Sequence, residues 1–231
     1  MFAGHYSTAF AARKLKPAVP LWHLFIATQL LDFAWAILVL LGVEKVRVVP
    51  HFMEASMLDL YYMPYTHSLP GSLGWAVGAG LLYALWWKDK RKVAAGLIFG
   101  AAVLSHWVLD LIVHAPDLLL YPGGPKVGFG LWESLLWSQL IEGGLLLGGV
   151  VIYVMCTQPK SPVGRWAPWA LFAFMVALQA YNHIPVEAPP SPVMFSIMAL
   201  FAYSLLALLA WLTDRTRMPR KDPASDEMKR A

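Results

Sequence analysis

Charged residues and cysteine are both scarce in this sequence. Only 14% of the 231 residues are charged, whereas 58% are hydrophobic. A typical soluble domain has about 25% charged and about 45–50% apolar residues, so the composition excludes a water-soluble globule and a disordered chain. Cys156 is the single cysteine, which excludes an internal disulfide framework and a cysteine-built metal cage. The net charge of +4 is small and dispersed, and we therefore expect no nucleic-acid partner.

Long apolar runs dominate the chain, and its mean hydropathy is +0.55. A helix needs about 20 apolar residues to cross the hydrocarbon core of a bilayer. The sequence therefore predicts an all-α fold, a polytopic membrane bundle with about six transmembrane helices. The predicted spans cover roughly residues 21–42, 71–87, 93–113, 131–156, 165–183 and 192–213.

The N-terminal segment 1–16 is mostly apolar but too short to cross a bilayer. Pro17 and Pro20 follow it and favour a turn. We interpret this segment as a re-entrant helix or half-helix, since broken helices at membrane depth occur where they are buried in protein or line a cavity. We expect residues 1–213 to form a single transmembrane domain and residues 214–231 to form a charged cytoplasmic tail.

The basic residues predict the orientation in the membrane. With six spans, most of the 18 Lys and Arg residues fall on one side. They precede the first predicted span, form the turn at 88–92, follow the fourth span and follow the sixth. The positive-inside rule places this side, and with it the C-terminus, in the cytoplasm.

Several ionisable residues lie in or beside the apolar runs. A charge at bilayer depth costs at least about 2.5–3.5 kcal/mol, so such residues are functional candidates. A rise of about 1.5 Å per residue places most of them in one layer, between mid-membrane and the outer face. The candidates are His5, Asp32, His67, His106, Asp110, His114, Asp117 and Glu142.

The spacing of three candidates indicates a shared helical face. His106, Asp110 and His114 stand at i, i+4 and i+8. Two ligands at i and i+4 can bind one metal ion. Imidazole and carboxylate ligands suit zinc and other divalent metals, with manganese or magnesium as alternatives. The simpler interpretation is an interhelical hydrogen-bonded pair that holds the bundle together.

Short motifs in the first 150 residues resemble the bacterial membrane-bound metal-dependent hydrolase family. The matching segments are Gly4-His5, Leu30-Leu31-Asp32, YTHSL at 65–69 and SHWVLD at 105–110, with HAPDLLLYPGG and GLWES resembling a subgroup. The family often has a basic residue shortly before THSL, where this chain has Met63-Pro64-Tyr65.

The resemblance implies a location in the bacterial inner membrane and hydrolysis by metal-activated water. It also implies one or two ions, with zinc as the first choice. The metal ligands it implies are His5, Asp32, His67, His106 and Asp110. His114 is a further candidate metal ligand. Alternatively, His114 and Asp117 do not bind the metal themselves and instead orient a residue that does. Asp110, Glu142 and Asp117 are the candidate catalytic carboxylates that exchange protons.

A site in the outer half of the bilayer predicts a membrane lipid or a lipid-linked small molecule as substrate, with a phosphoester favoured and an acyl ester or amide as the alternative. No Gly-x-Ser-x-Gly motif occurs, which disfavours a serine hydrolase. The same polar layer would also suit a small ion, proton or solute transporter. A bundle whose polar residues only pack helices is the third interpretation.

Overall fold

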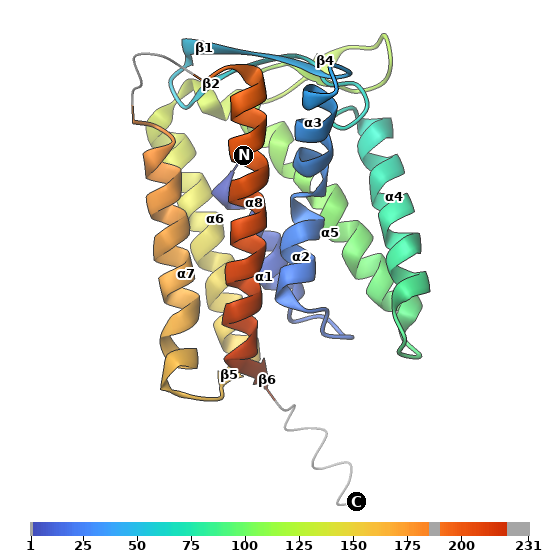
Figure 1. Cartoon of the computed structure of the whole chain (residues 1–231), viewed down its shortest axis with the longest axis vertical. Coiled ribbons are helices and arrows are strands. Elements are labelled where there is room, and N and C mark those ends of the chain that lie inside the picture. The colour runs from blue at the N-terminus through green and yellow to red at the C-terminus, as the bar shows by residue number, and fades with distance from the viewer. Residues whose placement is uncertain (1, 185–189, 221–231) are drawn as a thin grey trace, which may run out of the picture.

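The long apolar runs form helices that stand side by side in the computed structural model, which describes residues 2–184 and 190–220 (Figure 1). Two shorter helical pieces precede them at the N-terminus. In chain order the helices are η1 (Ala3–His5), α1 (Tyr6–Ala12), α2 (Leu21–Thr28), α3 (Leu30–Leu40), α4 (Leu69–Trp86), α5 (Lys92–Val113), η2 (Leu131–Glu133), α6 (Leu135–Cys156), α7 (Pro162–Tyr181) and α8 (Pro192–Arg215).

Three of these helices, α5, α6 and α8, are long and apolar enough to cross a membrane. A fourth span is obtained if α2 and α3 are taken together as one bent crossing. The mostly helical fold confirms the predicted all-α class, and the spans are those expected of a membrane protein. These three or four candidate spans do not confirm the predicted six-span bundle.

The first predicted span is broken rather than continuous. It divides at Gln29 into α2 and α3, whose axes differ by 51°. The last carbonyl groups of a helix have no partner within that helix, so a break exposes hydrogen-bond acceptors in the bundle interior. The other departures are at helix ends. For example, residues 131–133 form η2, and α6 starts only after Ser134, whose hydroxyl accepts from the Trp137 N–H.

The N-terminal segment forms a short helix inside the bundle, as the apolar pattern predicts. Tyr6 and Phe10 are fully buried, and Phe10 packs edge-on against Phe25 and against Tyr153. At Gly149 of α6, an added Cβ would lie 2.6 Å from the backbone oxygen of Ser7. Glycine thus lets α1 and α6 approach closely.

A β-hairpin that the sequence analysis missed covers one end of the bundle (Figure 1). Its strands β1 (Lys45–Met53) and β2 (Ser56–Tyr62) are antiparallel. Two smaller pairs join β3 (Leu118–Leu119) to β4 (Lys126–Val127) and β5 (Thr157–Pro159) to β6 (Arg217–Pro219). Most side chains of β1 are exposed, so the strand has no clear apolar alternation for a sequence pattern to reveal.

The basic connections gather at the opposite end, where α4, α6 and α8 end (Figure 1). Arg13 forms an ion pair with Asp214 there, with Nη2 3.2 Å from Oδ2. Residues 214–220 are therefore structured, since α8 continues to Arg215 and β6 pairs with β5. The rest of the predicted tail, residues 221–231, lies outside the described residues.

Candidate metal centre

Four histidines and two aspartates from distant parts of the chain converge near the C-terminal end of α5. His106 and Asp110 project from α5, and His114 is the residue that ends it. Asp32 comes from the first turn of α3. The remaining members are His5, from η1, and His67, from the turn before α4. All except the partly buried Asp32 are buried.

His106 lies at the centre of this group. Its Nδ1 donates to the carbonyl oxygen of Thr28, the last residue of α2, over 2.7 Å. Its Nε2 faces both carboxylates, at 3.1 Å from Asp110 Oδ2 and 3.4 Å from Asp32 Oδ1. A neutral imidazole carries one proton, so the Thr28 contact leaves the lone pair on Nε2.

His67 and His114 follow the same pattern. His67 Nδ1 lies 2.7 Å from the hydroxyl of Thr66, and His67 Nε2 lies 3.2 Å from Asp32 Oδ1. His114 Nδ1 donates to Asp117 Oδ1 over 2.8 Å, and its Nε2 lies 3.5 Å from Asp110 Oδ1. Each ring is thus fixed through one nitrogen and presents the other to a carboxylate.

Lone pairs that face carboxylates repel them unless positive charge lies between. Either protons on the rings or a bound cation can supply that charge. His106 Nε2 is buried beside both carboxylates, so positive charge is required at that position.

The distances fit ligands that share an ion. Nitrogen and oxygen ligands lie about 2.0–2.2 Å from a tetrahedral zinc ion, so two such ligands are about 3.3–3.5 Å apart. The Nε2 atoms of His67 and His106 lie 3.1–3.6 Å from oxygens of Asp32 and Asp110. Two triads have one ligand atom each within 4.8 Å of the others, namely His5–Asp32–His106 and His67–His106–Asp110. These buried groups could hold a metal ion.

His5 is oriented differently from the other three histidines. Its Nε2 lies 3.2 Å from the carbonyl oxygen of His106 and 3.1 Å from Asp110 Oδ1. Both neighbours are acceptors, so Nε2 is the protonated nitrogen in the neutral ring. The Nδ1 atom is buried and has no hydrogen bond among the described residues, and it is the atom through which His5 would ligate.

Asp32 is held by side chains that orient only one of its oxygens. Its Oδ2 accepts from the amide of Gln29 and from the hydroxyl of Tyr203, the latter over 3.2 Å. Its Oδ1 is the oxygen that faces His67 and His106. The carboxylate is thereby positioned in the way that supporting contacts position metal ligands.

Glu142 and Asp117, two of the candidate catalytic carboxylates, are engaged in other contacts. Glu142 Oε2 accepts from the backbone N–H groups of Phe2, over 2.9 Å, and Gly4, over 3.3 Å. It thereby holds the N-terminal segment against α6, while Asp117 orients His114. Proton transfer by either residue stays a prediction.

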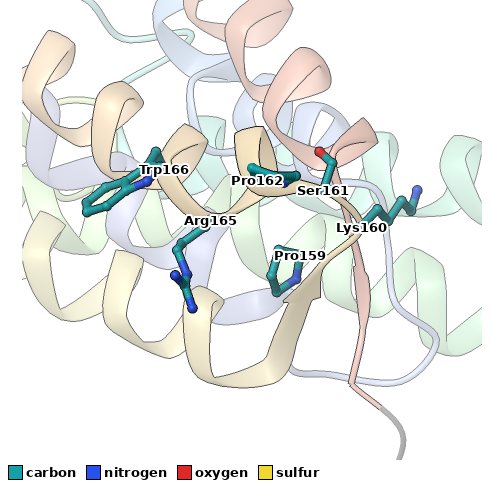
Figure 2. Close-up of a pocket in the computed structure, with 6 residues that line it drawn as sticks. All are labelled: Pro159, Lys160, Ser161, Pro162, Arg165 and Trp166. Atoms are coloured by element: carbon teal, nitrogen blue, oxygen red, sulfur yellow. The ribbon is translucent and has the colours of Figure 1, made fainter.

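A separate cavity of about 370 Å³ lies at the basic end, where α7 begins (Figure 2). Lys160 and Arg165 extend in different directions there, and Lys160 Nζ donates to the carbonyl of Arg215. Its lining residues are Pro159, Lys160, Ser161, Pro162, Arg165 and Trp166. None of them is a typical metal ligand, so this cavity is no part of the candidate metal centre.

The sequence analysis missed the residues that orient the ligands. Gln29 stands three positions before Asp32 in an apolar run, and this spacing is a signal that could have revealed it. Thr66 belongs to the THSL motif, but its contact with His67 depends on the rotamer of each side chain. Tyr203 and the Thr28 carbonyl lie too far along the chain from their partners for any sequence pattern to pair them.

Comparisons with models of protein families, with curated proteins and with solved structures found no significant match. The resemblance to the hydrolase family therefore stays a prediction from short motifs.

Proposed function

We propose that this chain is an integral-membrane metal-dependent hydrolase that acts on a lipid or lipid-linked phosphoester. The observation that carries the proposal is the shared orientation of His67, His106 and His114. Each is fixed through Nδ1, and each presents Nε2 to Asp32 or Asp110. Such fixed imidazoles beside carboxylates are typical of metal centres with a supporting second ring of contacts.

We assign metal binding to His5, Asp32, His67, His106 and Asp110, with His114 at the edge of the site. A bound divalent ion, with zinc as our first choice, would supply a Lewis acid and acidify a water molecule near neutral pH. Asp110 is the best placed carboxylate to accept a proton, because it lies within 3.6 Å of all four imidazoles. Burial of the group excludes bulk water, which strengthens every electrostatic interaction within it.

An apolar groove supports a lipid substrate. It has a volume of about 550 Å³ and runs along α4, with Leu30 of α3 on its other side. Leu30 is two residues from Asp32, and Pro70 of the groove is three residues from His67. We propose that one acyl chain lies in this groove. Its lining residues are Leu30, Pro70, Gly71, Gly74, Trp75, Gly78, Ala79 and Leu82.

The surroundings of the site argue against a transport pathway. A pathway must continue to the basic end of the bundle. Between His5 and Arg13 on the N-terminal helices lie Tyr6 and Phe10, which are fully buried in the apolar core with Phe25 and Leu146. This apolar layer separates the histidines from the basic end and favours a one-sided site.

The proposal is tested with detergent-purified full-length protein. Elemental analysis is expected to find zinc, manganese or another divalent metal at one or two equivalents. The metal-loaded protein is then assayed with p-nitrophenyl phosphate, bis(p-nitrophenyl) phosphate and phosphatidic acid, alongside p-nitrophenyl acyl esters. Release of phosphate or nitrophenol that disappears after chelation supports a hydrolase. A protein without metal would leave a hydrogen-bonded bundle, and a protein with metal but no hydrolysis would remove the enzyme assignment alone.

A further inference from the structure

We propose that Glu44 and Thr66 set the protonation of His67 and thereby position it as a metal ligand. This inference rests on the metal centre of the proposed function. Glu44 stands between α3, which bears Asp32, and the hairpin, and it is outside every motif of the sequence analysis. Its side chain is buried, as is that of Thr66.

The contacts of Glu44 fix it to the turn that carries His67. Its Oε1 accepts from the backbone N–H groups of Tyr65, over 2.8 Å, and Thr66, over 3.0 Å. Its Oε2 accepts from the hydroxyl of Thr66 over 2.7 Å. The same hydroxyl oxygen lies 2.7 Å from His67 Nδ1. A continuous chain of short hydrogen bonds therefore joins Glu44 to the imidazole.

The direction of each hydrogen bond follows from which of its two groups can donate a proton. A carboxylate only accepts, so the single hydroxyl proton of Thr66 points at Glu44. The hydroxyl oxygen can then only accept from His67, which requires the proton of the neutral ring to be on Nδ1. The lone pair is left on Nε2, the atom that faces Asp32 and Asp110. Glu44 is therefore a positioning residue that acts through Thr66.

Replacing the Glu44 carboxylate with an amide reverses the donor and acceptor roles in the hydrogen bonds from residue 44 to His67. In Glu44→Gln the amide oxygen still accepts from the Tyr65 and Thr66 backbone, while the amide nitrogen donates to the Thr66 hydroxyl. The hydroxyl must then donate to His67 Nδ1, and the ring proton moves to Nε2. A metal ion would have to displace that proton. Loss of such an outer contact typically lowers metal affinity about 10–100-fold.

The test measures Zn²⁺ affinity of the full-length protein in detergent by competition with a chromogenic chelator. Glu44→Gln and Thr66→Val are each expected to bind Zn²⁺ about 10–100-fold more weakly than the unmodified chain. Thr66→Ser keeps the hydroxyl and is expected to restore the original affinity. Glu54→Gln is the matched control, because Glu54 is exposed at the hairpin turn, where it accepts from the Leu135 backbone, and among the described residues it has no hydrogen bond or ion pair with the four histidines of the candidate metal centre.

A second measurement distinguishes positioning from general loss of structure. Nitrogen-15 chemical shifts of the metal-free protein, with the His67 signals assigned by their loss in His67→Ala, report which ring nitrogen carries the proton. The proton is expected on Nδ1 in the unmodified chain and on Nε2 in Glu44→Gln. If Glu44→Gln does not fold, the Zn²⁺ affinities of Thr66→Val and Thr66→Ser and the nitrogen-15 spectrum of the unmodified chain still test the proposal.

The outcomes separate the two proposals. Unchanged affinity in Thr66→Val and Glu44→Gln, or an Nε2 proton in the unmodified chain, would overturn the role of Glu44 and leave the metal centre standing. An unmodified chain that binds no Zn²⁺ would overturn both, since His67 would have no ion to bind.

Discussion

The imidazole rings of His5 and His106 are stacked, with centroids 3.8 Å apart and planes inclined by 11°. The two residues are 101 positions apart in the chain. His5 belongs to the N-terminal segment, which Glu142 holds through the backbone of Phe2 and Gly4. The candidate metal centre therefore depends on contacts that lie outside its own ligands.

The first prediction concerns this anchor. Glu142→Leu removes every acceptor for the Phe2 and Gly4 N–H groups, and leaving such buried groups unsatisfied costs about 1–3 kcal/mol each. We expect metal content to fall and the melting temperature in detergent to drop. Glu142→Gln keeps an acceptor and is expected to retain metal and activity within a few-fold. A loss of activity of about 100-fold or more in Glu142→Gln, with metal retained, would instead identify Glu142 as a general base.

The second prediction concerns the ligands themselves. Asp110→Asn and His67→Ala are each expected to reduce bound metal at least about 10-fold without unfolding the protein, as measured by elemental analysis and circular dichroism. Asp89→Asn is the control, because Asp89 is exposed and forms a local ion pair with Arg91. Full metal content in both ligand variants would contradict the assignment.

The third prediction concerns the groove along α4. An added Cβ at Gly74 meets no atom within 4 Å, so Gly74→Leu is expected to fold and to fill the groove. Gly143→Leu is the matched control, since Gly143 is equally open but lies in α6. We expect Gly74→Leu to raise KM several-fold for a long-chain lipid substrate and to leave p-nitrophenyl phosphate hydrolysis unchanged. If Gly74→Leu changed the hydrolysis of both substrates equally, the acyl chain would not bind in this groove.

The fourth prediction concerns the packing of α4 against α5. An added Cβ at Gly96 would lie 2.5 Å from the Gly80 oxygen and 2.7 Å from the Ala84 Cβ, so the two helices would have to separate. Gly96→Ala is expected to destabilise the protein by about 1–3 kcal/mol, measured by thermal unfolding in detergent. Gly148→Ala, where the added Cβ meets nothing within 4 Å, is expected to have no destabilising effect. If Gly96→Ala and Gly148→Ala melted at the same temperature, α4 and α5 would be able to separate at this contact without loss of stability.

The sequence predicted the helices and the convergence of the histidines for definite physical reasons. An apolar run as long as that of α5 forms a helix in lipid, because a helix lets its backbone N–H and C=O groups hydrogen-bond with one another where no water is present. His106 and Asp110 could be recognised because ionisable residues inside such a run are costly. The one-sided placement of basic residues likewise corresponds to one end of the bundle.

Other features could not be predicted because they depend on tertiary contacts. The break at Gln29 occurs in a mostly apolar run that has no proline or glycine near the break. Glu44 carries no sign in the sequence that it contacts residues 65 and 66, about 20 positions further on. The hairpin was missed because β1 exposes most of its side chains and β2 leaves most of its side chains partly buried, so neither strand shows a clear apolar alternation. The Thr28 carbonyl beside the break, for example, accepts from His106, which lies 78 positions further along the chain.

The bonds from Glu142 to Phe2 and Gly4 also have a consequence for biosynthesis. Glu142 leaves the ribosome 140 residues after Phe2. The N-terminal helix is made before α6 and has no docking partner on that helix until α6 has been translated. His5 can therefore be held beside His106 by this anchor only after α6 has been made, so a polypeptide that ends before α6 would have a less firmly fixed His5 in the candidate metal centre. Firm docking of the N-terminal segment would thus require synthesis to have passed α6.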